Sequence, residues 1–347
     1  MSLILEVDRD KSAGTQPALH HTSSSSVTDA PAGVEGHLLA CLDDGAGSRT
    51  ILDQAMAVAD ALDLSVAAAL VIETPTYAGA PADPLEWQVR RRESLDRLEH
   101  IIGLPSPPVE RVVLTGSAAD ELTGWARDHR ASVLALGTHA TAGHRTGLGE
   151  TAQRILQCAS ASLLLVPAGR AFRLPYRRLL VPLDGSVRAE SVLPFAVRIA
   201  RAHGAELVLA HVVPQPESID APESDGAAHA LCVRLAEQNE KGARDYLNGL
   251  QTQIWKEGLS VRAVVIGNAD ARVELVRLAQ AQHADLVVLA SHGRTGMVDV
   301  PCGSVTEYLA THAPAPLLIV RPSFDHRFGV PADSRDQGFF GFIPVQG

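Results

Sequence analysis

Two short segments combine small residues, a hydroxyl side chain and a histidine, and each is followed by the start of a helical pattern. The first reads LGTHA from Leu136, with Glu150-Thr151 after nine intervening residues; the second reads LASHG from Leu289, with Gly303-Ser304 after the same interval. Small residues let a backbone approach a ligand closely, and the N–H groups that open a helix attract anions. Both segments follow apolar, strand-like runs, so their position suits phosphate binding.

The second segment keeps more of the residues that phosphate binding favours. Gly293 and Gly303 are glycines, Ser304 opens the helical pattern, and Arg294 adds a charged donor. Counted by the same spacing, Glu150 of the first segment takes the place of Gly303. Its carboxylate would satisfy the helix dipole and repel a triphosphate, so we expect phosphate binding in the second segment and not in the first.

Each feature also has an ordinary structural explanation. Glycines near strand ends are common turn residues, Gly303-Ser304 suits a helix cap, and Asp184-Gly185-Ser186 suits a turn that opens a helix. The joint spacing favours a ligand site, because it brings all three features to one edge of a sheet.

An internal repeat determines how these segments are positioned. HLLACLD at residues 37–43 matches RLLVPLD at residues 178–184, and the same offset of 141 carries residues 66–72 onto residues 207–213. The offset then grows to 153, because the second copy has a longer loop near residues 214–228. Each copy alternates strands with helices, which implies right-handed crossovers. We therefore predict an α/β fold of two tandem doubly wound domains, each with a five-stranded, mostly parallel, Rossmann-like sheet.

Domain boundaries follow from where this pattern starts and stops. Ser23–Ser26 lies in an aperiodic start, Gly169 and Pro175 lie between the copies, and Phe339-Phe340 lies in an irregular end. The predicted divisions are a disordered leader (1–35), a first domain (36–168), a linker (169–175), a second domain (176–322) and an irregular tail (323–347).

The composition excludes several classes of function. The formal charge of −10 argues against nucleic acid as a partner. The four cysteines show no CxxC pairing, which is typical of reduced thiols. No apolar run is long enough for a membrane span, and no signal peptide opens the chain, so we predict a cytoplasmic protein. We expect Trp87, Trp125 and Trp255 to pack in helices.

Ligands in open α/β sheets bind beyond the carboxyl ends of the strands. In the second copy, Asp184 follows the first strand and suits ribose hydroxyls, while the backbone at Val212 ends the second strand and suits an adenine edge. The residues predicted to bind a nucleotide are Pro182, Leu183, Asp184, Val212, Ala290, Ser291, His292, Gly293, Arg294, Gly303, Ser304 and Val305.

Other chemistries find little support in the sequence. The segment from Leu289 lacks the first glycine of a nucleophile elbow, and His292 adjoins Ser291, so we do not expect its imidazole to reach that hydroxyl. There is no P-loop, and no spacing of histidine, cysteine or carboxylate residues indicates a metal site. We assign no catalytic residue.

The chain resembles the universal stress protein family (UspA-like) in its tandem two-domain form, over both copies. The resemblance rests on VPLDGS from Val181, LAHVV from Leu209, SHGRTG from Ser291 and GSV from Gly303. The ATP-binding branch of that family has Gly, two residues, Gly, nine residues, Gly, then Ser or Thr. Here Ala290 replaces the first glycine, a change that adds only a methyl group.

The resemblance implies ATP in the second domain, with the Mg²⁺ that accompanies it, and a role as a stress-response regulator or sensor. It also implies pairing of the last strands, residues 163–166 and 317–320, into an intramolecular pseudo-dimer, and leaves a homodimer open. No general base is evident, so we expect a binder with at most slow ATP hydrolysis.

Two alternatives remain open. One is a nucleotide-free scaffold that uses its terminal strands for dimerisation and partner binding. The other is an adenylyl transferase of related fold, which would show a Ser-Gly-Gly type of loop where this chain has Leu183-Asp184-Gly185-Ser186.

Overall fold

The computed structural model describes residues 36–43, 45–73, 84–103, 108–139, 147–214, 226–293 and 302–321. The predicted leader, the predicted tail and Arg294 lie outside the described residues.

The first repeat alternates strands and helices in the predicted order. Its elements are β1 (His37–Leu42), α1 (Ser48–Leu62), β2 (Ser65–Ile72), α2 (Pro84–Ile102), β3 (Glu110–Thr115), α3 (Ala118–Asp128), β4 (Ala131–Gly137), α4 (Glu150–Cys158) and β5 (Ser162–Val166).

The second repeat has the same order with one additional short helix, α5. Its elements are β6 (Arg178–Pro182), α5 (Val187–Glu190), α6 (Leu193–His203), β7 (Glu206–Val212), α7 (Gly226–Lys256), β8 (Val261–Ile266), α8 (Ala271–Ala281), β9 (Leu286–Ala290), α9 (Ser304–His312) and β10 (Leu317–Val320).

Ten strands form one sheet in the order β3-β2-β1-β4-β5-β10-β9-β6-β7-β8. Within each repeat the five strands are parallel, which confirms the predicted fold class. The terminal strands of the repeats pair with each other: β5 and β10 are antiparallel, with Leu164 opposite Leu318. The strand pairing expected between the two copies is therefore present within the chain.

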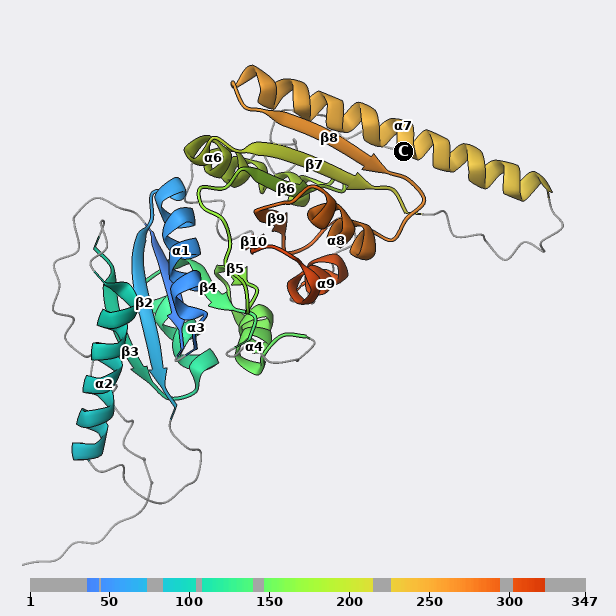
Figure 1. Ribbon diagram of the computed structural model, residues 1–347. Coiled ribbons are helices and arrows are strands. Elements are labelled where there is room, and N and C mark those ends of the chain that lie inside the picture. The colour runs from blue at the N-terminus through green and yellow to red at the C-terminus, as the bar shows by residue number, and fades with distance from the viewer. Residues whose placement is uncertain are drawn as a thin grey trace, which may run out of the picture. The chain divides into compact units, whose positions relative to one another are not determined.

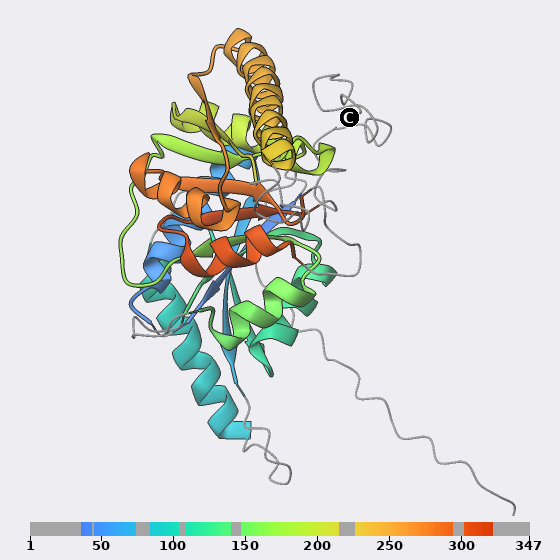
Figure 2. The same ribbon diagram turned by 90° about the vertical axis from the view of Figure 1, so that its right-hand side faces the viewer.

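Helices cover both faces of the sheet, as the alternation of residues along the strands requires. In β1, Leu38 and Ala40 pack on the face covered by α1, α2, α6 and α7, whereas Leu39 and Cys41 pack on the face covered by α3, α4, α8 and α9. Figure 1 shows α7 running alongside β8. In Figure 2 the strands of the second repeat separate α7 from α9. Strands buried on both sides explain the near-continuous apolar runs in the sequence.

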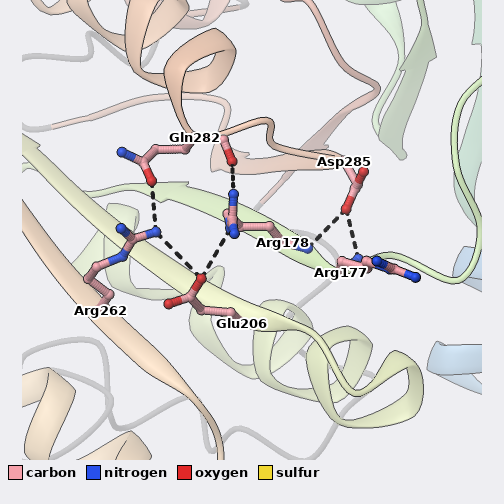
Figure 3. A network of polar contacts seen from close by, with 6 residues as sticks. All are labelled: Arg177, Arg178, Glu206, Arg262, Gln282 and Asp285. Atoms are coloured by element: carbon pink, nitrogen blue, oxygen red, sulfur yellow. Dashed lines mark hydrogen bonds and ion pairs between the residues drawn. The ribbon is translucent and has the colours of Figure 1, made fainter.

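A polar network ties together the amino ends of the strands in the second repeat (Figure 3). Glu206 of β7 accepts from Arg178 of β6 at 3.1 Å and from Arg262 of β8 at 3.4 Å, and Arg262 also donates to Gln282 Oε1 at 2.7 Å. Asp285, just before β9, accepts the backbone N–H of Arg178 at 3.0 Å. The amino ends of four strands are thus held in register, and this positions their opposite, carboxyl ends. The residues of the network are Arg177, Arg178, Glu206, Arg262, Gln282 and Asp285.

The three tryptophans do not behave alike. Trp125 of α3 is buried and stacks on His129, with ring centroids 4.1 Å apart, as predicted. The prediction is wrong for Trp87, which is 39% exposed on α2, and for Trp255, which is 68% exposed on α7. Trp255 adjoins Ile254, which is fully buried and packs α7 at this point, whereas Trp87 lies in a stretch of α2, residues 85–93, that is exposed throughout. Among the helices of the described part, none is long and apolar enough to span a bilayer.

Candidate functional site

The candidate site lies at the point where the strand order of the second repeat reverses. The chain leaves β6 toward β7 on one side, and β9 pairs with β6 on the other. The loops that follow β6 and β9 therefore diverge and leave a crevice at the carboxyl edge, the usual ligand position in such sheets. A cavity of about 370 Å³ occupies this crevice.

The structure brings most of the predicted residues to this cavity. Its lining includes Pro182, Leu183, Asp184, Val212, Ala290, His292, Gly293, Gly303, Ser304 and Val305. Ser291 does not line it; this residue is buried beneath the loop. Arg294 lies outside the described residues.

Asp184 is held in one orientation by its own loop. Its Oδ1 accepts hydrogen bonds from the Ser186 N–H at 3.0 Å and from Ser186 Oγ at 2.6 Å. Its Oδ2 approaches Gly293 so closely that a β-carbon at position 293 would overlap it. Glycine at 293 therefore lets the β6 loop and the β9 loop meet, and the carboxylate lies between them.

The start of α9 presents donors to the cavity. Gly303 is the N-cap of this helix and, having no side chain, cannot cap the helix itself. The Gly303 N–H donates to Ser291 O at 2.8 Å, and Thr306 Oγ1 donates to Ala290 O at 3.0 Å, so the helix start is anchored on the β9 loop. The first N–H groups of a helix have no partner within the helix and carry its positive partial charge. An anion at Ser304 and Val305 would satisfy them.

Val212 presents its backbone at the side of the cavity. The Leu183 N–H donates to Ala210 O at 2.8 Å, and the Val213 N–H donates to Ile266 O on the other side. Because backbone groups alternate in direction along a strand, the peptide groups of Val212 point toward the end of β6. These peptide groups could form hydrogen bonds with a ligand in the cavity.

The histidine after β9 reaches the preceding hydroxyl, contrary to expectation. Ser291 Oγ lies 3.1 Å from His292 Nδ1, and in the first repeat Thr138 Oγ1 lies 3.2 Å from His139 Nδ1. The turn after the strand folds the ring back on its neighbour, which counting along the chain does not show. Since the contact recurs in both repeats and Ser291 is buried, it is a property of the turn and gives no sign of a nucleophile.

Cys302 is a lining residue that the sequence reasoning missed, together with the apolar residues of the cavity floor. Burial raises the pKa of the Cys302 thiol to about 11, so the thiol is protonated at neutral pH. In the sequence, its position directly before Gly303 could have indicated that Cys302 lines the cavity. The remaining missed lining residues are Ala189, Ala210, Ala271, Leu275, Leu289 and Thr306.

The first repeat keeps a glycine at the start of its corresponding helix, which corrects the alignment of the two copies. Gly149 is the N-cap of α4, with φ −62° and ψ 155°, and Gly303 has φ −71° and ψ 154°. The Gly149 N–H donates to Thr138 O at 2.8 Å, just as Gly303 donates to Ser291. The equivalent of Gly303 is therefore Gly149, and Glu150 corresponds to Ser304. The loop is one residue shorter in the first repeat, so equal spacing misaligned the two copies.

A larger cavity, of about 1330 Å³, lies at the carboxyl edge of the first repeat. Asp43, His139 and Gly149 line it, as do Arg90 of α2 and the exposed Glu150 of α4. Glu150 still places a carboxylate in the first turn of the helix, where it competes with an anionic ligand. The two cavities thus differ in size and in charge.

Metal ligands are not clustered in the part of the chain that the structure describes. No group of three histidine, cysteine, aspartate or glutamate residues there could hold an ion. Asp184 is the carboxylate among the described residues that line the second cavity.

A model of the universal stress protein family matches residues 36–167 and 175–321. A universal stress protein of Methanocaldococcus jannaschii is 25% identical over 146 residues, which cover 42% of this chain and 82% of the relative. One of Mycobacterium tuberculosis is 29% identical over 211 residues, covering 60% and 64%.

Among solved structures, a universal stress protein of Archaeoglobus fulgidus DSM 4304 is similar, with a TM-score of 0.59 and 15% identity. The match covers 82% of this chain and 96% of that one, and it shows a shared fold. The family model accounts for both repeats and for most of the sequence. The chain therefore belongs to the universal stress protein family.

Proposed function

We propose that this protein binds an adenine nucleotide, ATP, in the cavity of its second repeat and acts as a cytoplasmic stress-response regulator or sensor. The observation that carries the proposal is the meeting of Asp184, the Val212 backbone and the uncapped start of α9 around one cavity. Along the strand order β9-β6-β7, the start of α9 suits a phosphate chain, Asp184 suits the ribose, and the Val212 backbone suits an adenine edge.

The cavity fits such a ligand. Its volume of about 370 Å³ lies within the range of about 300–1,000 Å³ that is usual for small-molecule sites. Ala210, Ala271 and Leu275 give it an apolar floor suited to a purine. Gly293 and Gly303 leave the backbone exposed where phosphates would lie. ATP would bring its own Mg²⁺ to this site.

Binding is better supported than catalysis. Asp184 Oδ1 is occupied by two hydrogen bonds from Ser186, which suits an acceptor held in place for a ligand hydroxyl. Effective hydrolysis needs a base within reach of an attacking water. We expect at most slow turnover.

A melting experiment with ATP and a matched pair of variants tests the proposal. When the ATP concentration is about 100 times Kd, bound ATP stabilises the native state by about 2.7 kcal/mol. This should raise the melting temperature by several degrees. Gly303→Glu should abolish the shift, because its carboxylate would lie where we place the phosphates. The backbone should tolerate the change, since a β-carbon at 303 meets its nearest neighbour, Ser291 O, at 3.5 Å.

Gly149→Glu makes the same change at the equivalent position of the first repeat and should leave the ATP shift intact. Glu150→Ser, which copies Ser304 into the first repeat, tests whether that carboxylate alone excludes a second nucleotide. If that carboxylate alone excludes the nucleotide, calorimetry of the Glu150→Ser variant should show a second binding event. If the wild type shows no shift at millimolar ATP, the nucleotide-free scaffold replaces the proposed function.

A nucleotide-free scaffold could not use its terminal strands to bind a partner protein. β5 and β10 pair with each other, and each also pairs with an inner strand, so both edges of these strands are in use. Partner binding would have to use other surfaces, such as the exposed Leu85 of α2 and Leu231 of α7.

A further inference from the structure

A buried carboxylate lies directly behind the loop that carries Asp184. Glu190 ends α5, the short helix that follows this loop, and is only 4% exposed. Tyr246 of α7 donates a hydrogen bond from its hydroxyl to Glu190 Oε1 at 3.0 Å. The Tyr246 ring packs against the main hydrophobic core and makes an edge contact with His211, with centroids 6.2 Å apart. The phenol thus links α7 to α5.

α5 is held at both of its ends. At its start, Ser186 Oγ accepts the Ala189 N–H at 3.1 Å and donates to Asp184 Oδ1 at 2.6 Å. At its end, Glu190 is held by Tyr246. Between them, Ala189 lines the cavity. A helix of four residues is not stable by itself, so these external contacts determine where it lies.

The described part of the first repeat lacks this arrangement. There α1 begins at Ser48 without a preceding helix, and Arg49 takes the position of Glu190 by the repeat offset. Arg49 pairs with Asp53 at 2.9 Å and donates to Ile101 O of α2 at 3.1 Å. Among the described residues, the buried carboxylate and its phenol donor therefore occur in the repeat with the candidate nucleotide site.

Stability alone does not explain a carboxylate in this place. Burying a charged group is costly, and a polar pair in an interior is often no more stable than apolar residues of the same size. Burial, and to a smaller extent the neighbouring carboxylates of Glu190 and Asp184, raise the pKa of Tyr246, so its hydroxyl keeps its proton and remains a donor. The buried hydrogen bond between Tyr246 and Glu190 lies next to the loop that carries Asp184, and this position indicates a role in shaping that loop.

We propose that Tyr246 and Glu190 are positioning residues for the nucleotide site: their hydrogen bond holds α5 and, through Ser186, keeps Asp184 in the orientation that binds ligand. This inference rests on the proposed function. It makes α7 a part of the binding machinery although, within the described residues, no side chain of α7 lines the cavity.

Calorimetric titration of the full chain with ATP tests the inference. Tyr246→Phe keeps the ring and removes the donor, so ATP affinity should fall about tenfold, as expected for one hydrogen bond. Glu190→Gln still offers an oxygen to the Tyr246 hydroxyl and should bind nearly as well as the wild type. Glu190→Leu removes the acceptor and should bind as weakly as Tyr246→Phe.

Two further variants separate positioning from general stability. The double variant Tyr246→Phe/Glu190→Leu should bind no more weakly than either single variant, because both remove the same contact. Tyr308→Phe makes the same chemical change on α9, where the ring stacks on His312, and should leave affinity unchanged.

Melting without ligand gives the necessary second readout. If Tyr246→Phe and Glu190→Leu melt earlier but bind ATP with wild-type affinity, the contact is purely structural and the inference is overturned. If the wild type itself does not bind ATP, the proposed function fails and the inference falls with it. The two failures are distinguished by the wild-type titration.

Discussion

At the scale of single residues, the candidate site depends on contacts that leave no room for a β-carbon. Gly293 is the clearest case, because Asp184 Oδ2 lies where a β-carbon would be placed. Glycine at position 293 allows the loop after β6 and the loop after β9 to approach each other closely. By contrast, a β-carbon at position 303 would make only ordinary van der Waals contacts, and Gly303 has an ordinary φ, so its contribution is that it brings no capping side chain of its own. Two glycines of one motif therefore act through different physical effects.

Gly293→Ala should weaken ATP binding by about tenfold or more, because the methyl group would displace the Asp184 carboxylate and a hydrogen bond to a charged group contributes about 1.5–3 kcal/mol. Isothermal calorimetry measures the affinity. Gly124→Ala on α3 of the first repeat, where a β-carbon meets nothing within 4 Å, is the control and should leave affinity unchanged. An unchanged affinity in Gly293→Ala would show that Asp184 does not contact the ligand.

At the scale of elements, the helices around the site begin in two different ways. α8 begins with Asp270, whose Oδ1 accepts the Arg272 N–H at 2.9 Å, so its first turn is capped from within the chain. α9 begins with Gly303 and has no such cap. Since both helices contribute residues to the cavity, the difference identifies α9 as the helix whose first N–H groups are available to an anion.

Asp270→Ala should destabilise the protein by about 1 kcal/mol at pH 7, the usual loss for an N-cap. Hydrogen bonds from Arg272 hold the pKa of Asp270 below its ordinary value of 3.8. A lowered folded pKa means that the stabilisation is fully present above about pH 4 and is lost as the pH falls through the folded value. Urea unfolding at pH 7 and at pH 3 measures the free energy of unfolding of both proteins. The difference in this free energy between wild type and variant should be smaller at pH 3.

At the scale of the whole molecule, the two repeats share their core. One cluster of buried side chains includes Leu52 and Leu62 of α1 together with Phe195 and Ile199 of α6. Tyr176, just before β6, is fully buried in this cluster, and its hydroxyl donates to Gln54 Oε1 of α1 at 2.8 Å. With the β5–β10 pairing, these contacts should make the repeats unfold together.

We expect a single cooperative unfolding transition for the described repeats, with the same midpoint by tryptophan fluorescence and by circular dichroism. Tyr176→Phe should lower the free energy of unfolding by about 1–3 kcal/mol, because it leaves the buried Gln54 amide oxygen without its donor. Trp255→Phe, on an exposed side chain, should change it little. Two separate transitions in the wild type would contradict the shared core.

The sequence by itself determined what depends on local periodicity. Continuous apolar runs defined the strands, the offset of 141 aligned β1 with β6 and β2 with β7, and the positions of Asp184, Gly293 and Gly303 after their strands located the candidate site. Parallel strands bring their carboxyl ends to one edge, so position along the chain was enough to place these residues together.

Only the tertiary structure decided what depends on contacts through space. It placed Gly149 opposite Gly303, because a loop shorter by one residue cannot be recognised from spacing alone. It exposed Trp255 and buried Cys302, since the side of a helix that is covered depends on its neighbours. The hydrogen bond between Glu190 and Tyr246 joins residues 56 positions apart, and no pattern in either segment indicates the other.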